Sequence, residues 1–105
     1  MELDYKRCPS FEAAFELLGK RWTGLIIRAL LSGHKRFTDI SKMIEQMSDR
    51  MLSERFKELE TEGIVVRRVY DETPVRIEYE LTEKGRALEP MMKECEKWAE
   101  EWSAK

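Results

Sequence analysis

A chain of 105 residues, with 42% hydrophobic and 38% charged side chains, is long enough for one globular domain with a modest core. Its formal net charge of −2 gives no reason by itself to expect a nucleic-acid ligand, and two distant cysteines exclude a disulfide framework. Without a signal peptide or an apolar run near the ~18 residues of a membrane span, we expect a cytoplasmic protein with reduced thiols and no membrane partner.

The charge is distributed unevenly along the chain. Residues 17–57 hold nine basic and four acidic side chains, whereas residues 77–105 hold five basic and eight acidic ones. A nucleic-acid ligand, if there is one, is therefore expected at the middle of the chain. The one histidine and two cysteines are too few for an ordinary structural zinc site, so no metal or cofactor is expected.

The first two predicted elements are helices. Phe11, Ala14, Phe15 and Leu18 repeat at helical spacing and predict a helix over about 9–18 that ends before Gly19. The apolar positions from Trp22 to Leu30 repeat the pattern, and Gly33 ends that second helix.

Cys8 is the predicted N-cap of the first helix, because Pro9 lacks an N–H and suits the first helical position. A helix N-terminus and the neighbouring Lys6 and Arg7 favour the thiolate. Cys8 is therefore a candidate redox sensor. The alternative is an inert, small N-cap at the helix start or at a dimer seam.

The next two predicted helices are joined by a very short connection. Thr38 is expected to cap the third helix and Ser48 the fourth, which ends before Gly63. The side chains expected to point inward are Ile40, Met43, Ile44 and Met47 from the third helix, and Leu52, Phe56 and Leu59 from the fourth.

The pattern then changes to that of strands. Ile64 to Tyr70 is rich in β-branched residues, and Val75, Ile77, Tyr79 and Leu81 alternate with charged residues, which predicts one buried face. Residues 71–74 are typical of a turn, so the segment is a predicted β-hairpin. Thr82 is expected to cap a last helix over about 83–103, which Pro90 should kink or break.

This order predicts a mainly α fold: four helices, a β-hairpin and a last helix, in one domain spanning residues 1–105. It is typical of a winged helix-turn-helix, with the helix-turn-helix at about 38–62 and the wing at about 64–81. The fourth helix would enter the major groove of double-stranded DNA. Its side opposite the core carries the candidate contacts Arg50, Ser53, Glu54 and Lys57, beside the cap Ser48.

Other basic residues flank this helix. Arg55 lies nearer the core stripe and could serve the structure or a phosphate. Lys35 and Arg36 precede the third helix and could hold phosphates, although Arg36 could equally be a structural hydrogen-bond donor. Arg76, near the hairpin tip, is the candidate wing contact to the minor groove or the backbone.

The sequence resembles the HxlR-type winged helix-turn-helix regulators, of the MarR-like superfamily, over essentially its whole length. The resemblance lies in CPSFEAAFELLGKRWTGLIIRALLSGHKRFTDI, SDRMLSERFKELETEGIV, TPVRIEYELTEKGRAL and the late Trp98. It implies a homodimeric repressor or activator that binds a pseudo-palindromic operator. In the thiol-based, quinone- and redox-sensing YodB-like members, a cysteine like Cys8 responds to quinones, aldehydes or oxidants.

The resemblance also implies that the helices at about 9–18 and 83–103 form the dimer. The candidate interface residues are Phe11, Phe15, Met91, Cys95, Trp98 and Trp102. The alternative is that these side chains cover the domain's own core. Cys95 is expected to be a packing residue, although an intersubunit Cys8–Cys95 or Cys8–Cys8 disulfide stays open.

Three other functions are alternatives to a DNA-binding, thiol-sensing regulator. No nucleophile–base set or phosphate-binding glycine loop is present, so an enzyme is not expected. A winged helix that binds protein would show little salt dependence, unlike a DNA reader. The third is a small-molecule-responsive regulator without thiol sensing, with a pocket between the dimer helices lined by Trp22, Phe15 and Trp98.

Overall fold

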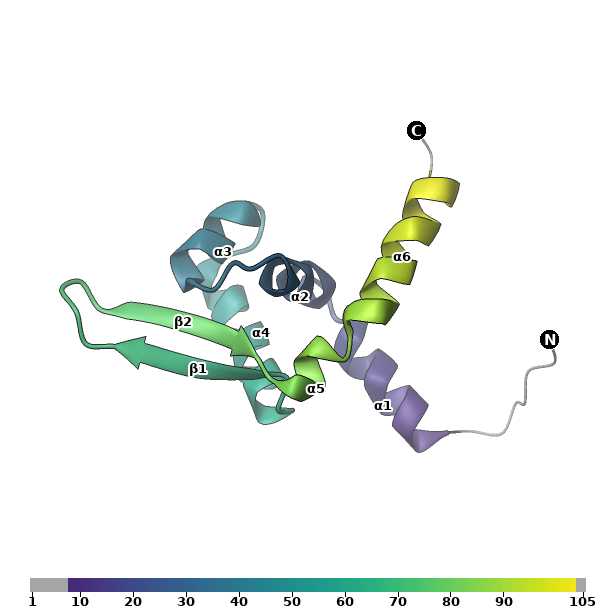
Figure 1. Cartoon of the computed structure of the whole chain (residues 1–105), viewed down its shortest axis with the longest axis horizontal. Coiled ribbons are helices and arrows are strands. Elements are labelled where there is room, and N and C mark those ends of the chain that lie inside the picture. The colour runs from purple at the N-terminus through teal and green to yellow at the C-terminus, as the bar shows by residue number, and fades with distance from the viewer. Residues whose placement is uncertain (1–7, 104–105) are drawn as a thin grey trace.

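The computed structural model describes residues 8–103 (Figure 1). Their elements, in chain order, are α1 (Pro9–Leu18), α2 (Thr23–Leu31), α3 (Phe37–Met43), α4 (Asp49–Thr61), β1 (Val65–Tyr70), β2 (Arg76–Leu81), α5 (Glu83–Arg86) and α6 (Glu89–Trp102). This confirms the predicted mainly helical fold with a two-stranded wing. The last helix is broken rather than continuous: α5 has four residues, and α6 starts with Pro90 in its first turn.

The core is built around α4. Leu52, Phe56 and Leu59 are fully buried, as the spacing predicts, and the Phe56 ring stacks on Tyr79 of β2 with a centroid distance of 3.7 Å. Ile26 and Ile27 of α2 are also fully buried. Burial of apolar surface is the dominant stabilising term in a domain of this size, and it holds α4 with one face inward and the other outward.

Two of the predictions for α3 are wrong. The helix starts at Phe37 with Arg36 at the N-cap position, so Thr38 lies inside the first turn and does not cap it. The side chain of Met43 is 50% exposed, whereas Ile40, Ile44 and Met47 are buried as predicted. Because α3 ends at Met43, Ile44 and Met47 reach the core from the connection to α4 rather than from one helical stripe.

The wing is antiparallel, with register Val65↔Leu81 through Tyr70↔Arg76. Its inner edge is paired with the segment before α3, since the Tyr79 N–H donates to the Lys35 carbonyl at 2.8 Å and Arg36 bridges to Glu78. The prediction that Val75 is buried is wrong: it is 57% exposed, because β2 starts one residue later and Val75 belongs to the turn.

The two terminal helices lie on the side of the core opposite the wing tip (Figure 1). Neither has a buried residue. Phe11 and Phe15 are each 62% exposed, and Trp98 and Trp102 are 64% and 67% exposed. These four aromatic side chains therefore do not cover the domain's own core, which was the alternative to a dimer interface.

Candidate nucleic-acid interface

Helix α4 begins with a side-chain cap. The Ser48 hydroxyl accepts a hydrogen bond from the Met51 N–H at 3.1 Å, as predicted. A second contact, which the sequence does not predict, joins α3 to α4: the Ser41 hydroxyl donates to the Asp49 carboxylate at 2.5 Å. No local pattern signals it, because the two residues lie in different helices. Together the two bonds set the start of α4 relative to α3.

Replacing Ser48 by alanine should lower the free energy of unfolding by about 1 kcal/mol, because an N–H in the first turn of α4 loses its acceptor. Chemical denaturation would measure the loss. Ser48→Asp keeps an acceptor at the cap and should stay near wild type. An alanine variant as stable as wild type would contradict the assigned cap.

The outer face of α4 carries the predicted set. Arg50, Ser53, Glu54 and Lys57 are all exposed, opposite the buried stripe. Within residues 8–103, neither Arg50 nor Lys57 has an ion-pair partner. Their charges are therefore available to an anion. Arg50 can also pair with a guanine edge, and Glu54 can accept from a cytosine amine.

Arg55 lies at the side of α4 rather than on this face. Its side chain is 14% exposed, its Nε donates to the Arg21 carbonyl at 2.9 Å, and its guanidinium pairs with Glu58 at 3.3 Å. Of the two roles left open by the sequence, this geometry favours the structural one.

The two basic residues before α3 differ in their surroundings. Lys35 pairs with Glu80 of β2 at 3.4 Å. Arg36 is exposed, and its side chain has no hydrogen bond to another described residue. Its backbone forms the bridge to Glu78. The guanidinium of Arg36, like that of Arg50, is therefore available to bind an anion such as a phosphate.

Two of the three arginines in the wing, Arg68 and Arg76, are paired with carboxylates. The guanidinium of Arg76 pairs with Glu72 and Glu78, both at 3.3 Å, and lies over the Tyr70 ring at 4.2 Å. The hydrogen bond from Arg68, with its charge and that of Lys35, lowers the pKa of Glu80 below its usual value. A wing with paired charges attracts DNA less strongly than the outer face of α4 does.

The two thiols are both exposed and free. Cys8 occupies the predicted N-cap position of α1, with Pro9 at the first helical position, and its side chain makes no capping bond. Lys6 and Arg7, expected to favour the thiolate, lie outside the described residues. Cys95 is on α6, and its predicted role as a packing residue is not seen within this chain.

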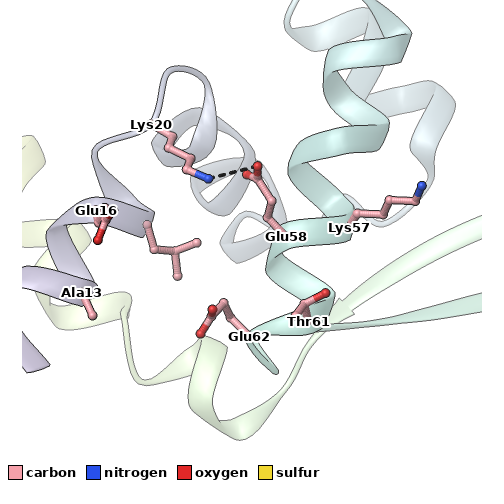
Figure 2. Close-up of a pocket in the computed structure, with 8 residues that line it drawn as sticks. Ala13, Glu16, Lys20, Lys57, Glu58, Thr61 and Glu62 are labelled. Atoms are coloured by element: carbon pink, nitrogen blue, oxygen red, sulfur yellow. Dashed lines mark hydrogen bonds and ion pairs between the residues drawn. The ribbon is translucent and has the colours of Figure 1, made fainter.

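Residues 8–103 contain no group of three or more His, Cys, Asp or Glu side chains that could hold a metal ion. None of the described helices is long and apolar enough to cross a membrane. A cavity of about 610 Å³ lies between α1 and α4 (Figure 2). Its lining includes Ala13, Leu17 and Lys57. The pocket expected between the helices of a dimer, lined by Trp22, Phe15 and Trp98, stays a prediction.

Comparisons with known proteins agree with this architecture. Residues 17–105 match the HxlR-like helix-turn-helix family. The uncharacterised helix-turn-helix transcriptional regulator YvaP of Bacillus subtilis (strain 168) is 56% identical over 95 residues, which cover 90% of this chain and 88% of YvaP. The transcriptional regulator YodB of the same organism is 53% identical over 95 residues, covering 90% of this chain and 85% of YodB.

Solved structures give the same result. The reduced form of B. subtilis YodB superposes with a TM-score of 0.80 at 51% identity, covering 93% of this chain and 96% of that one. Its quinone-bound form gives 0.78 at 49% identity, covering 90% and 100%. The redox regulator HypR in its reduced form gives 0.82 at 36% identity, covering 88% and 91%.

Proposed function

Since the chain belongs to the HxlR-like helix-turn-helix family and is a helix-turn-helix transcriptional regulator, not an enzyme, we propose that it is a homodimeric repressor in the cytoplasm that reads a pseudo-palindromic operator with α4. The observation that carries this proposal is the outer face of α4. It presents Arg50 and Lys57 without partners among the described residues, at the most basic part of the chain. Ser48, Ser53 and Glu54 supply further polar contacts, and Lys35, Arg36 and Arg76 flank them.

The exposed aromatic residues support the dimer. Exposure of large apolar side chains to water is unfavourable, and their clustering on a surface is typical of a protein–protein interface. Six residues on α1 and α6 would form it: Phe11, Phe15, Met91, Cys95, Trp98 and Trp102. A two-fold axis through these helices would place two copies of α4 about 34 Å apart, one turn of DNA.

Cys8 is the proposed site of regulation. Its thiol is exposed, and it starts the helix that carries Phe11 and Phe15 of the proposed interface. Attachment of a quinone or aldehyde, or oxidation to a disulfide, would change the surface at which the two copies meet. The spacing of the two α4 helices would then no longer equal one turn of DNA, and the affinity for the operator would fall. Similarity to YodB, solved in a quinone-bound form, supports this choice of inducer.

Fluorescence anisotropy on the DNA upstream of the gene tests the proposal. Affinity should fall steeply with salt and should fall again after treatment with diamide or a quinone. Cys8→Ser should bind DNA but ignore the treatment, whereas the matched variant Cys95→Ser should still respond to the quinone. The response of Cys95→Ser to diamide separates a Cys8–Cys8 disulfide, which it keeps, from a Cys8–Cys95 disulfide, which it loses. A weak salt dependence would favour a protein-binding module. Normal binding that ignores the treatment would favour the small-molecule-responsive alternative.

Replacing Arg50 by alanine should weaken operator binding by about 1–3 kcal/mol and relax the preference at one base position, if the guanidinium pairs with a guanine. Anisotropy on a set of single-base operator variants would measure both effects. Lys57→Ala is the matched comparison: as a phosphate contact, it should weaken binding to all of these sequences alike. Unchanged affinity and preference in Arg50→Ala would contradict the placement of α4.

A further inference from the structure

The segment that joins α1 to α2 contains an unusual backbone conformation. Trp22 has φ 79° and ψ −21°, in the left-handed region. A bulky residue seldom adopts this conformation, because its Cβ crowds the backbone, and it persists only where the surrounding structure enforces it. Trp22 itself packs partly buried against the core. The contacts that hold Trp22 in this conformation are therefore expected around residues 19–22.

The first of these contacts comes from α4, the helix proposed to read DNA. The Nε of Arg55 donates to the carbonyl oxygen of Arg21 at 2.9 Å. Because a peptide group is planar, this bond orients the whole unit that joins Arg21 to Trp22, and φ of Trp22 is the rotation that follows that unit. The guanidinium from α4 thus holds the peptide that carries the strained conformation.

The second contact is an ion pair beside the first. Glu58, one turn further along α4, pairs with the guanidinium of Arg55 at 3.3 Å and with the ammonium of Lys20 at 3.0 Å. Figure 2 shows Lys20 and Glu58 pointing toward each other from opposite sides. We call Lys20, Arg21, Arg55 and Glu58 the clamp. It joins α4 to the residues that directly follow α1.

Lys20 and Glu58 of the clamp line the cavity of about 610 Å³ that separates the rest of α1 from α4 (Figure 2). Ala13 and Glu16 of α1 line one side, and Thr61 and Glu62 line the other. A change in the tilt of α1 would therefore not be absorbed by packing against α4. It would act on residues 19–22, and through them on the clamp.

We propose that Arg55 and Glu58 are positioning residues that couple the position of α1 to that of α4. Arg55 holds the Arg21–Trp22 peptide against α4, and Glu58 fixes the guanidinium and Lys20 together. A displacement of α1 after modification of Cys8 is thereby transmitted to the outer face of the same α4 turns, which carries Ser53, Glu54 and Lys57. This regulation rests on the proposed DNA-binding function and its thiol switch.

Hydrogen exchange of the free protein tests the clamp without DNA. Arg55→Met keeps much of the apolar stem but loses both contacts, and it should raise amide exchange at residues 19–23 roughly threefold to thirtyfold. Arg55→Lys keeps the positive charge but loses the planar guanidinium that reaches both acceptors, so its amide exchange should resemble that of Arg55→Met. The control is Arg28→Met, which removes an ion pair of the same kind to Glu96 on α6 and should leave residues 19–23 unchanged. Equal exchange in Arg55→Met and wild type would overturn the proposal.

DNA binding supplies the second readout. In Glu58→Gln, which keeps the shape and removes the charge, the loss of affinity caused by diamide should be smaller than in wild type by roughly threefold or more. Its melting temperature separates this effect from general destabilisation. A full diamide response in a folded Glu58→Gln protein would overturn the coupling. A wild type that binds no DNA or ignores diamide would refute the proposed function, and the exchange readout would still decide whether the clamp holds.

Discussion

Replacing Phe56 by alanine should lower the free energy of unfolding by about 3–5 kcal/mol. Phe56 is fully buried, and its ring is stacked on Tyr79 at 3.7 Å with an interplanar angle of 4°. A second ring, that of Phe37, lies 6.2 Å away. Alanine would leave a cavity where α3, α4 and β2 meet, and the stacked ring would lose its partner.

Urea denaturation followed by circular dichroism would measure the loss. Phe56→Leu is the matched comparison, since it fills more of the space and should cost clearly less than the alanine variant. The alanine variant should also bind DNA more weakly, because the buried stripe of α4 fixes the direction of its outer face. A loss of stability below about 1 kcal/mol would mean that the core collapses into the space or that Phe56 is not central to it.

Replacing Gly85 by alanine should lower the free energy of unfolding by roughly 3 kcal/mol, at the upper end of overpacking effects. Gly85 of α5 lies against the connection between α4 and β1, where an added Cβ would clash with the carbonyl oxygen of Ile64 and would lie 2.8 Å from Cδ2 of Leu81. The backbone at Ile64 cannot yield easily. Its carbonyl also accepts the Thr82 N–H at 2.9 Å.

Gly24 offers a control for this experiment. It lies in α2, and an added Cβ would meet nothing within 4 Å. Gly24→Ala should therefore be neutral, or stabilising by up to about 1 kcal/mol, because alanine favours the helix. Thermal unfolding of both variants would compare them. A Gly85→Ala protein as stable as Gly24→Ala would contradict the close approach of α5 to Ile64.

The features that local sequence patterns encode were predictable. The cap at Ser48 depends on residues three positions apart, the buried stripe of α4 on helical periodicity, and the wing on alternation along two neighbouring segments. The break before α6 follows from Pro90, which cannot continue a helix hydrogen-bond ladder. The exposure of Arg50 and Lys57 follows from the same periodicity, so this part of the candidate site needed no structure.

The features that depend on tertiary contacts were not predictable. Lys20 and Glu58 are 38 positions apart, and no periodicity relates them. The place of Arg76 near the hairpin tip predicts a DNA contact, but nothing in the local pattern predicts that Glu72 and Glu78 pair with its guanidinium. Thr38 and Met43 were misplaced because α3 has only seven residues, too few for a periodic pattern to fix its ends.

The absence of buried residues from α1 and α6 has a consequence for the turnover of the protein in the cell. Helices held by little buried surface open locally far more often than the rest of a domain, and proteases cleave such segments first. A copy that has found no partner would expose both helices to this attack, whereas pairing would shield them. The same surface that we assign to assembly would thus mark unassembled copies for removal and keep the pool of free monomer small.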